Sequence, residues 1–520
     1  MRAHTDPDAG ASTAPGARQD ARRDGGGRHA VVIGGGIAGL AAAHRMLASG
    51  GGGGDGGAGT RAWRSVTVLE ASPRLGGKLR TGRIADVRVD LGAESLLARR
   101  PEAVALARET GLGDRLVAPS AAGAALWNRG RLVPMPKGHV MGVPGEAAAL
   151  AGVLSAEGLR RVERDRDLPP TEVGDDTAVG EYVAARLGRE VVDRLVEPLL
   201  GGVYAGDAYR ISMRSAVPQL FRAARTHASL TEGVRELQRA AAEHPVGGPV
   251  FLGIEGGVGS LPPAVADAVR ARGGEIRTGT RASALRRTGE GRWRITVDDG
   301  ARGGGDVLDA DAVVLALPAP AAALLLAAEA PAAAAELRSV EYASMALITL
   351  AYRRSDAELP PGTGFLVPPV DGHTIKAATF SGGKWGWVAA QDPGLVVLRA
   401  SVGRYGETEV LRRDDAALVD AARRDLGAAT GLAGRPVASL VTRWDDGLPQ
   451  YPVGHHARVE RVRAALPPGL AVCGAAYDGV GVPACVAGAR AAADLLRGDT
   501  AGSAGRAADP VRSPRGGAGQ

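Results

Sequence analysis

The sequence predicts an α/β protein whose parallel sheet is assembled from separate pieces of the chain. A short apolar strand at 30–33 runs directly into a glycine-rich turn and then an alanine-rich helix. A second apolar strand at 65–69 ends in an acidic residue, and further apolar strands follow at 312–317 and 470–474. Short apolar runs bounded by turn residues are typical of buried parallel strands. Together these observations favour a Rossmann-like domain.

The first turn carries the pattern Gly34-x-Gly36-x-x-Gly39 between its strand and its helix. Gly34 allows the tight turn, Gly36 lets the backbone approach a pyrophosphate, and Gly39 lets the helix pack closely on the strand. The first helical turn, with Ile37 and Ala38, offers unpaired N–H groups and the positive end of the helix dipole. The pattern therefore predicts a bound dinucleotide.

The second strand ends at Glu70, which is followed by Ala71. Such units carry an acid about 20 residues after the glycines, where it binds ribose hydroxyls. Glu70 lies 31 residues after Gly39, but 50–60 is almost pure glycine and reads as an inserted solvated loop. An insertion is tolerated because the cost of loop closure grows only logarithmically with length. A carboxylate here favours FAD or NAD over NADP, whose 2′-phosphate it would repel.

The segment that follows favours FAD. Its residues Arg74, Gly76, Gly77 and Lys78 resemble the second glycine signature of the amine-oxidase-like FAD superfamily. The resemblance implies that the glycine pair passes close to the FAD and that a neighbouring basic residue faces the flavin. It also implies a nucleotide domain split along the chain, so that later segments return to its sheet.

Two later segments fit that expectation. The segment 275–285 reads as strand, turn and strand, and the resemblance implies that its backbone lines the adenine, at Ala282 in our assignment. Near the C-terminus, the strand at 470–474 leads through the loop 478–483 into a helix of small residues, whose N-terminus would stabilise an electron-rich group. The resemblance implies that this group is the N1/O2 edge of the flavin. The residues that we assign to this contact are Val480, Gly481 and Val482.

Other segments point to a family. The segments 135–144, 197–220 and 443–455 are similar to segments characteristic of porphyrinogen oxidases, as is the 478–483 loop. The sequence is identified on these motifs as a member of the oxygen-dependent porphyrinogen oxidase family over roughly residues 29–497.

Two features depart from the family pattern. One is the glycine-rich insertion at 50–60. The other is the segment 381–386, where the family usually has a shorter serine–lysine–tryptophan–proline run. The second departure leaves the local role of Lys384 open.

The resemblance implies FAD-dependent, oxygen-using oxidation of coproporphyrinogen III to coproporphyrin III in heme biosynthesis. Six electrons leave the macrocycle, so the flavin N5 would take a hydride in each of three cycles, and oxygen would give hydrogen peroxide. No side chain is assigned as catalytic, and Trp444 is assigned to the cofactor. Basic residues would bind the propionates of the substrate. The substrate candidates are Arg80, Arg99, Arg100, Lys137 and Tyr204.

Three alternatives stay open at this point. The substrate could be protoporphyrinogen IX, because propionate and vinyl groups differ at a pocket mouth that the sequence does not place. The chain could be another enzyme of the same fold, such as an amine oxidase or a carotenoid desaturase. It could also be a non-catalytic flavin protein that carries porphyrin.

Composition limits the partners. The 520 residues carry 63 Lys and Arg against 57 Asp and Glu, for a net charge of +6, and both signs are interspersed. No basic stripe with interleaved aromatic residues is present, so nucleic acid is not expected as a partner. Cys473 and Cys485 form no disulfide or metal signature, and the pair His455-His456 lacks further ligands at suitable spacing, so no metal is expected. These features favour a cytoplasmic protein. The family resemblance implies the porphyrinogen, molecular oxygen and downstream heme-pathway enzymes as candidate partners.

The expected domains follow from these assignments. The apolar run 312–328 is too short and too broken by proline to span a membrane, so at most peripheral membrane contact is expected. The N-terminal residues lack the apolar stretch of a signal peptide. On composition we expect disorder at both ends of the chain. The expected divisions are a disordered 1–27, an FAD-binding domain at 28–100, 250–320 and 466–497, a helical cap at 101–249, a sheet-containing substrate domain at 321–465 and a disordered tail at 498–520.

Overall fold

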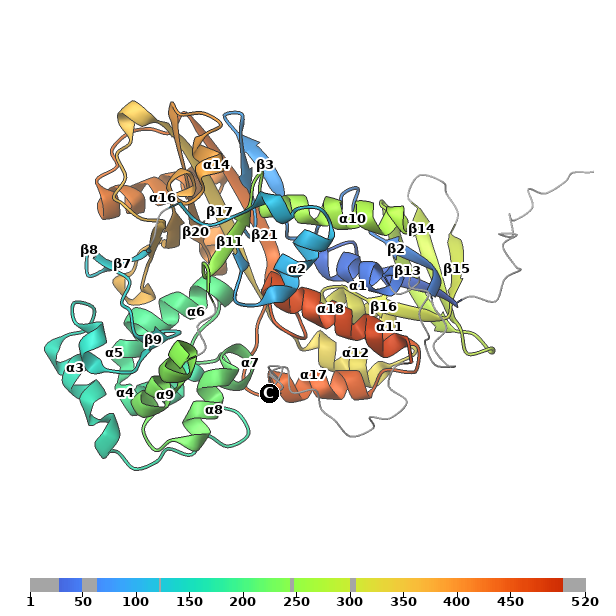
Figure 1. Cartoon of the computed structure of the whole chain (residues 1–520), viewed down its shortest axis with the longest axis horizontal. Coiled ribbons are helices and arrows are strands. Elements are labelled where there is room, and N and C mark those ends of the chain that lie inside the picture. The colour runs from blue at the N-terminus through green and yellow to red at the C-terminus, as the bar shows by residue number, and fades with distance from the viewer. Residues whose placement is uncertain (1–27, 49–62, 121–122, 244–246, 300–304, 499–520) are drawn as a thin grey trace, which may run out of the picture.

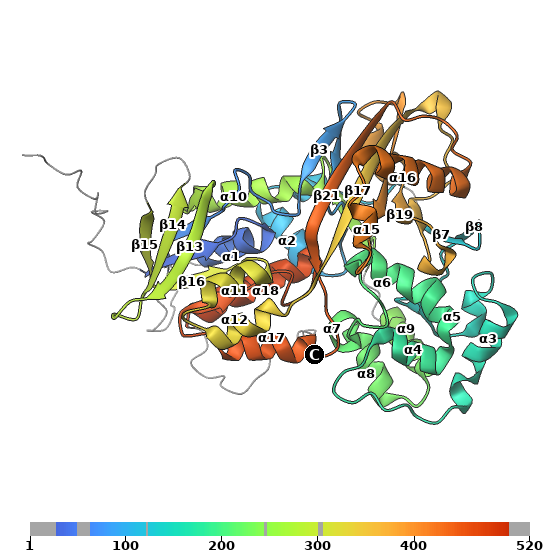
Figure 2. The same ribbon diagram turned by 180° about the vertical axis from the view of Figure 1, so that it is seen from behind.

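The computed structural model describes residues 28–48, 63–120, 123–243, 247–299 and 305–498. The segment 1–27, the insertion at 50–60 and the tail after Gly498 lie outside these residues. The described chain forms a nucleotide-binding region around a parallel sheet, a second region around a larger sheet, and a helical cap (Figure 1). In both views the cap lies next to the larger sheet and the nucleotide-binding region lies to one side (Figure 2).

Five parallel strands form the centre of the nucleotide-binding region. In spatial order they are β12 (Glu275–Arg277), β2 (Trp63–Leu69), β1 (Arg28–Ile33), β16 (Ala312–Leu315) and β22 (Leu470–Val472). Because all five strands run in the same direction, the glycine loop, Glu70 and the C-terminal loop all follow strands at one edge of the sheet, where such folds bind ligands. The predicted α/β fold is confirmed.

Alternate residues of β1 pack on opposite faces of this sheet. Ala30 and Val32 belong to one core, which contains α1 (Ile37–Leu47), α10 (Leu261–Ala271) and α18 (Val482–Leu496). Val31 and Ile33 belong to the core on the other face. That core contains β13 (Thr280–Arg287), β14 (Trp293–Asp299), β15 (Asp306–Ala310), α11 (Ala319–Leu326) and α12 (Pro331–Arg338). Burial on both faces explains why the strands are apolar throughout.

A seven-stranded sheet forms the second region. In spatial order its strands are β21 (Ala438–Pro449), β17 (Tyr342–Arg353), β20 (Leu395–Val402), β19 (Ile375–Thr379), β18 (Gly364–Leu366), β7 (Ala125–Asn128) and β8 (Arg131–Pro134). Leu418 and Leu426 of α16 (Asp415–Thr430) pack into the core on one face. The long strands β17 and β21 run from this sheet toward the nucleotide-binding region (Figure 2).

The cap is helical and has its own core, which includes Leu195 and Tyr204. Its helices are α3 (Ala156–Glu163), α4 (Val179–Leu187), α5 (Arg189–Val191), α6 (Glu197–Tyr204), α7 (Met213–Ala216), α8 (Pro218–Thr226) and α9 (Leu230–Glu243). A fully buried ion pair joins Arg186 to Asp165 at 2.7 Å, and the Asp165 carboxylate also accepts a hydrogen bond from Ser229. Hydrogen bonds of this kind are what makes a buried ion pair tolerable.

Five elements lie outside the domains in which the sequence places them. The sequence places α2 (Pro101–Glu109) in the cap, but Ala103 and Leu106 pack in the core beside α1. It places 125–134 in the cap too, but β7 and β8 pair into the seven-stranded sheet. It places α12 and α17 (His455–Ala464) in the substrate domain, but both pack against the parallel sheet. Each element lies where its apolar face is buried. Its position along the chain does not reveal which sheet or core buries that face.

The apolar run 312–328 forms β16 and α11. Among the described residues, no helix combines the length and the apolar character needed to cross a bilayer.

Candidate cofactor site

The glycine loop between β1 and α1 is shaped by contacts that leave no room for side chains. Gly34 has a φ of +114°, and a Cβ there would lie 2.4 Å from the carbonyl oxygen of Ala316. A Cβ on Gly39 would lie 1.9 Å from the carbonyl oxygen of Gly34. At Gly36, the N-cap of α1, a Cβ would meet no described atom within 4 Å. The loop is therefore tightly packed at Gly34 and Gly39 and leaves open space beside Gly36, where a pyrophosphate could approach the backbone.

Glu70 is held at the end of β2 by backbone donors. Its Oε2 accepts a hydrogen bond from the Gly35 N–H at 2.7 Å, and its Oε1 accepts one from the Ser72 N–H at 2.8 Å. A carboxylate can accept about four hydrogen bonds, so two acceptor positions remain for ribose hydroxyls. Ala71, the next residue, is exposed.

The second glycine signature lies directly against the first. The Gly76 N–H donates to the Gly35 carbonyl at 2.9 Å, and a Cβ on Gly77 would lie 3.5 Å from the Cα of Gly36. The Arg74 guanidinium donates to the Gly77 carbonyl at 2.8 Å. Arg74 therefore fixes the shape of this loop through contacts within the protein.

Lys78 directly follows the second glycine signature and lies near α18. Its side chain is accessible, yet protein surrounds it closely enough that desolvation lowers the pKa of its ammonium, with Cys485 and Asp446 opposing the shift. The ammonium lies 5.9 Å from the centre of the Tyr342 ring. Cys485 belongs to the first turn of α18. Lys78 is therefore close to the N-terminus of that helix.

The N-terminal turn of α18 follows a loop with two positive-φ glycines, Gly474 and Gly479. Gly481 is the N-cap of α18, and Val482 begins the helix and is buried. Val480 packs against the core of the cap. The assigned residues thus lie where the cap, the parallel sheet and α18 meet.

A short wall links Lys78 to the seven-stranded sheet. The Trp444 Nε1–H of β21 donates to the Leu91 carbonyl at 2.9 Å. A Cβ on Gly92 would lie 2.2 Å from the Lys78 carbonyl oxygen and 3.4 Å from the Trp444 ring. Only glycine fits between these two groups, so Trp444, Gly92 and Lys78 form one packed unit.

Ala282 lies on β13 beside the acid-bearing strand. Pairing between β13 and β14 shifts register between Ala282 and Ala284, which interrupts the regular ladder. The Thr280 N–H of the same strand donates to the Glu70 carbonyl at 2.9 Å. The residue left out of the pairing is Ser283, next to Ala282, and a bulge withdraws backbone groups from the ladder, so this stretch is suited to backbone contact with an adenine.

Tyr204, a substrate candidate, lies where the cap meets the end of β21. Its ring centre lies 5.5 Å from that of Tyr451, and Gln450 Nε2 donates to the Tyr204 carbonyl at 2.9 Å. The Tyr451 hydroxyl donates to the carbonyl of Ala475, in the loop before α18. Burial raises the pKa of Tyr204 to about 12. Both rings are buried, so they form a packed, mostly apolar contact between the cap and the loop before α18.

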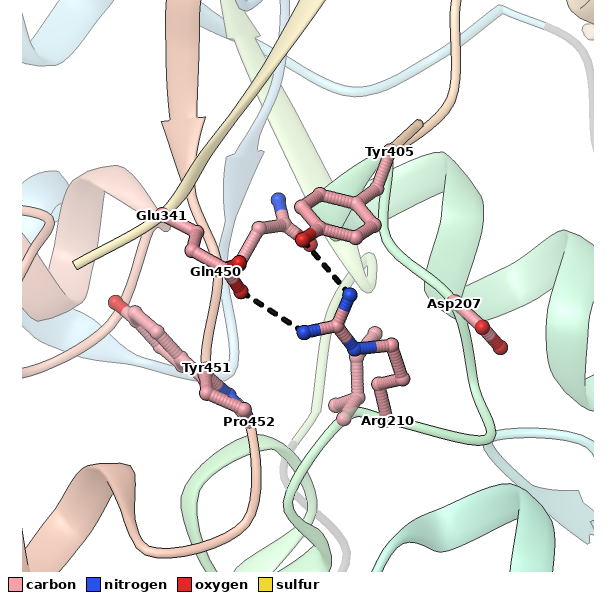
Figure 3. Close-up of a pocket in the computed structure, with 8 residues that line it drawn as sticks. Asp207, Arg210, Glu341, Tyr405, Gln450, Tyr451 and Pro452 are labelled. Carbon is pink, nitrogen blue, oxygen red and sulfur yellow. Dashed lines mark hydrogen bonds and ion pairs between the residues drawn. The ribbon is translucent and has the colours of Figure 1, made fainter. Parts of the chain in front are cut away.

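Figure 3 shows a small pocket at this junction. Arg210 donates to the Tyr405 hydroxyl at 2.7 Å and to Glu341 at 2.9 Å, and its guanidinium lies 4.6 Å from the centre of the Tyr405 ring. The cavity measures about 10 Å³, roughly the space for one water. The cavity is therefore too small for a macrocycle. The hydrogen bonds of Arg210 across it join the cap to the larger sheet. The lining residues are Asp207, Arg210, Ile211, Glu341, Tyr405, Gln450, Tyr451 and Pro452.

The basic substrate candidates lie on separate elements. Arg80 follows the second glycine signature, Arg99 follows β5 (Leu96–Leu97), and Lys137 lies between β8 and β9 (His139–Val140); all three are exposed. Arg100 is the N-cap of α2, and its guanidinium donates to Glu102 at 2.9 Å. Arg100 is therefore already paired, whereas the other three present accessible side chains.

The sequence does not predict the role of Lys384, and the structure supplies it. Lys384 Nζ donates to Glu94 Oε1 at 2.8 Å and to Ser95 Oγ at 3.0 Å. Arg399 lies 2.9 Å from the other oxygen of Glu94. The signal in the sequence was Arg399 itself, a charged residue in the middle of the apolar strand 395–402.

The adjacent histidines have separate partners. His455 is buried and stacks on the Tyr451 ring at 4.2 Å between centres, whereas His456 Nε2 lies 3.4 Å from Glu460. Among the described residues, no three His, Cys, Asp or Glu side chains are grouped as metal ligands would be.

Comparison with known proteins gives one family match. The family described as flavin containing amine oxidoreductase matches residues 37–496. The coproporphyrinogen III oxidase of Mycobacterium tuberculosis strain H37Rv is 38% identical over 432 residues, which cover 82% of this chain and 90% of the relative. The coproporphyrinogen III oxidase of Bacillus subtilis is 33% identical over 438 residues, with the same coverage. The protoporphyrinogen oxidase of Bos taurus is 29% identical and covers 83% of this chain and 93% of the relative.

Solved structures share the fold. A crystal structure from Exiguobacterium sp. 255-15 superposes with a TM-score of 0.77 at 33% identity, covering 90% of this chain and 98% of that one. Cyclohexylamine oxidase from Brevibacterium oxydans superposes with a TM-score of 0.64 at 17% identity, covering 91% of this chain and 99% of that one. At this lower identity the similarity concerns the fold.

Proposed function

We propose that this chain, which belongs to the flavin-containing amine oxidoreductase family, oxidises coproporphyrinogen III to coproporphyrin III with FAD as cofactor and molecular oxygen as oxidant. Membership of the family confirms the predicted flavin cofactor and the predicted oxidoreductase activity. The observation that carries the proposal is the convergence of Gly36, Lys78 and the first turn of α18, from three distant segments, on one site.

The residues present fit FAD. Gly36 leaves open space at the N-terminus of α1 for the pyrophosphate, and Glu70 keeps two acceptor positions for the ribose. The backbone at Ala282 would contact the adenine. Lys78 and the N–H groups at the start of α18 would stabilise negative charge at the flavin end. When bound, FAD supplies a hydride acceptor at N5 and reoxidation by oxygen, which for six electrons gives three hydrogen peroxides per porphyrin.

The protein's own contribution is to position the substrate and exclude water. Apolar side chains are available on α6 and the neighbouring β18: Val203, beside Tyr204, is 45% exposed, and Leu366 lies 3.6 Å from a Cβ placed on Gly202. We assign this surface to the macrocycle. Arg80, Arg99 and Lys137, whose side chains are accessible, are the candidates for the propionates, because guanidinium and ammonium groups pair with carboxylates.

Several finer assignments belong to the same proposal. They are a cytoplasmic location, contact with downstream heme-pathway enzymes and, at most, peripheral contact with a membrane. Leu324 of α11, 79% exposed, is an apolar side chain in the region assigned to that membrane contact.

Initial rates on the two porphyrinogens test the substrate. Purified, FAD-loaded protein should convert coproporphyrinogen III faster than protoporphyrinogen IX at equal concentration, followed by the fluorescence of the porphyrin formed. A higher kcat/KM for protoporphyrinogen IX would transfer the assignment to that substrate, which the bovine relative is named for. Oxidation of an amine, with neither porphyrinogen converted, would instead identify an amine oxidase.

A further inference from the structure

A buried cluster of charges lies beside the wall formed by Trp444, Gly92 and Lys78. The Glu94 carboxylate lies between Lys384 at 2.8 Å and Arg399 at 2.9 Å, and these three side chains are 9%, 17% and 9% exposed. Burial would raise the pKa of Glu94, but Arg399 and Lys384 hold it below its ordinary value. The cluster therefore keeps one ionised carboxylate between two cations, Arg399 on β20 of the seven-stranded sheet and Lys384 on α13 (Ser381–Lys384).

The cluster is joined to the wall through the backbone. Arg399 donates to the carbonyls of Asp90 and Gly92, both at 2.9 Å. Gly92 is the residue packed between the Lys78 carbonyl and the Trp444 ring. Only Ala93 separates Gly92 from Glu94, so the position of the carboxylate constrains the path of this short segment.

Asp90 anchors the other end of the segment. Its carboxylate accepts hydrogen bonds from the Val258 and Gly259 N–H groups at 2.9 and 3.0 Å. Burial raises the pKa of Asp90 to about 6 against these two hydrogen bonds and the charge of Arg399. The segment 90–94 is thus held at both ends, by the turn before α10 and by Lys384 and Arg399.

We propose that Glu94, clamped between Lys384 and Arg399, is a positioning residue that holds the Gly92–Trp444 wall and sets the electrostatic potential at the flavin. The proposal rests on the proposed cofactor site and is independent of the substrate. It gives a role to the segment 381–386, in which this chain departs from the family pattern.

Charge changes at the cluster act in opposite directions. Glu94→Gln removes the negative charge and leaves two cations, which favour the anionic, reduced flavin. Lys384→Met removes a positive charge and disfavours the anionic, reduced flavin. Because the cluster is buried, salt screens these effects weakly. A change that merely loosened the fold would not reverse sign between the two variants.

The test measures the midpoint potential of bound FAD and the FAD dissociation constant, both without porphyrinogen. Glu94→Gln should raise the potential and Lys384→Met should lower it. A tenfold change in the ratio of reduced to oxidised flavin corresponds to about 30 mV for a two-electron couple. The double variant should return toward the starting potential. Glu94→Gln should also weaken FAD binding about tenfold. The substitution breaks the charged hydrogen bonds to Lys384 and Arg399 that hold the Gly92–Trp444 wall beside the cofactor site.

Matched variants complete the test. Lys384→Arg, which keeps the charge, should leave the potential unchanged; with Lys384→Met it tests the proposal even if Glu94→Gln does not fold. Glu409→Gln removes an exposed carboxylate, paired with Arg412 at 3.0 Å, and should change neither quantity. Equal potentials in all folded variants, or shifts of one sign in both single variants, would overturn the proposal. Absence of FAD from the unmodified protein would instead refute the proposed function.

Discussion

The carbonyl oxygen of Gly34 lies where a Cβ on Gly39 would have to be, at 1.9 Å from that position. The last glycine of the loop therefore packs against the first. Between them, Gly36 faces open space at the start of α1. The three glycines of one motif thus have different physical roles, and substitutions can separate these roles.

Gly36→Ala should leave the fold intact and prevent cofactor binding. The added Cβ meets no described atom within 4 Å, so it projects into the space assigned to the pyrophosphate. We expect FAD affinity to fall at least tenfold, roughly 1.4 kcal/mol, with the melting temperature of the apoprotein unchanged. Isothermal titration with FAD and thermal unfolding measure the two quantities.

Gly39→Ala and Gly289→Ala serve as the two comparisons. Gly39→Ala should destabilise the apoprotein because its Cβ clashes with backbone, whereas at Gly289 a Cβ has no described neighbour within 4 Å. Gly289→Ala should therefore bind FAD normally. Normal FAD affinity in Gly36→Ala would show that the pyrophosphate does not lie there.

Glu70→Gln should weaken FAD binding by about ten- to a hundredfold. The amide keeps the size of the side chain but removes the charge, and hydrogen bonds to charged groups contribute about 1.5–3 kcal/mol. Part of the loss comes from weaker hydrogen bonds from the Gly35 and Ser72 N–H groups, which the Glu70 carboxylate accepts in the unmodified protein. Equilibrium titration of the apoprotein with FAD gives the affinity. An unchanged affinity would remove Glu70 from the cofactor site.

His455 should make the protein less stable as the pH falls from about 6.5 to about 4. Burial, with a smaller contribution from Arg458, lowers the pKa of His455 from 6.5 to about 4. In that range the unfolded chain takes up a proton that the folded protein excludes, so stability is present at higher pH and is lost on acidification. The full loss would be about 3 kcal/mol.

Denaturant unfolding between pH 4 and 7 measures this effect. The free energy of unfolding of the unmodified protein, minus that of His455→Asn, should decrease toward acid. His456→Asn changes the exposed neighbour and should keep the unmodified pH dependence. If His455→Asn loses stability toward acid as steeply as the unmodified protein, His455 is not the group responsible.

Local signals predicted the nucleotide-binding strands well. The strands at 30–33, 65–69 and 312–317 are apolar because both faces of the sheet are covered, and turn glycines mark where α1 and α18 begin. The domain boundaries were harder, because α2 and β7 join regions that are distant along the chain. The region to which such an element belongs is decided by the core or sheet that buries its apolar face.

The site was predictable where a motif carries its own geometry. The glycines and Glu70 are such residues, because spacing along the chain places them. The Glu94–Lys384–Arg399 cluster was not predictable, because its members lie on β20, on α13 (Ser381–Lys384) and before β5 and meet only after the two sheets pack. Gln450 and Arg210 were missed for the same reason.

Anaerobic mixing of the FAD-loaded protein with coproporphyrinogen III tests the central claim most directly. The account predicts that the absorbance of oxidised flavin near its visible maximum disappears as porphyrin forms, and that it returns when oxygen is admitted. Flavin that stays oxidised with coproporphyrinogen III and with protoporphyrinogen IX would contradict the account.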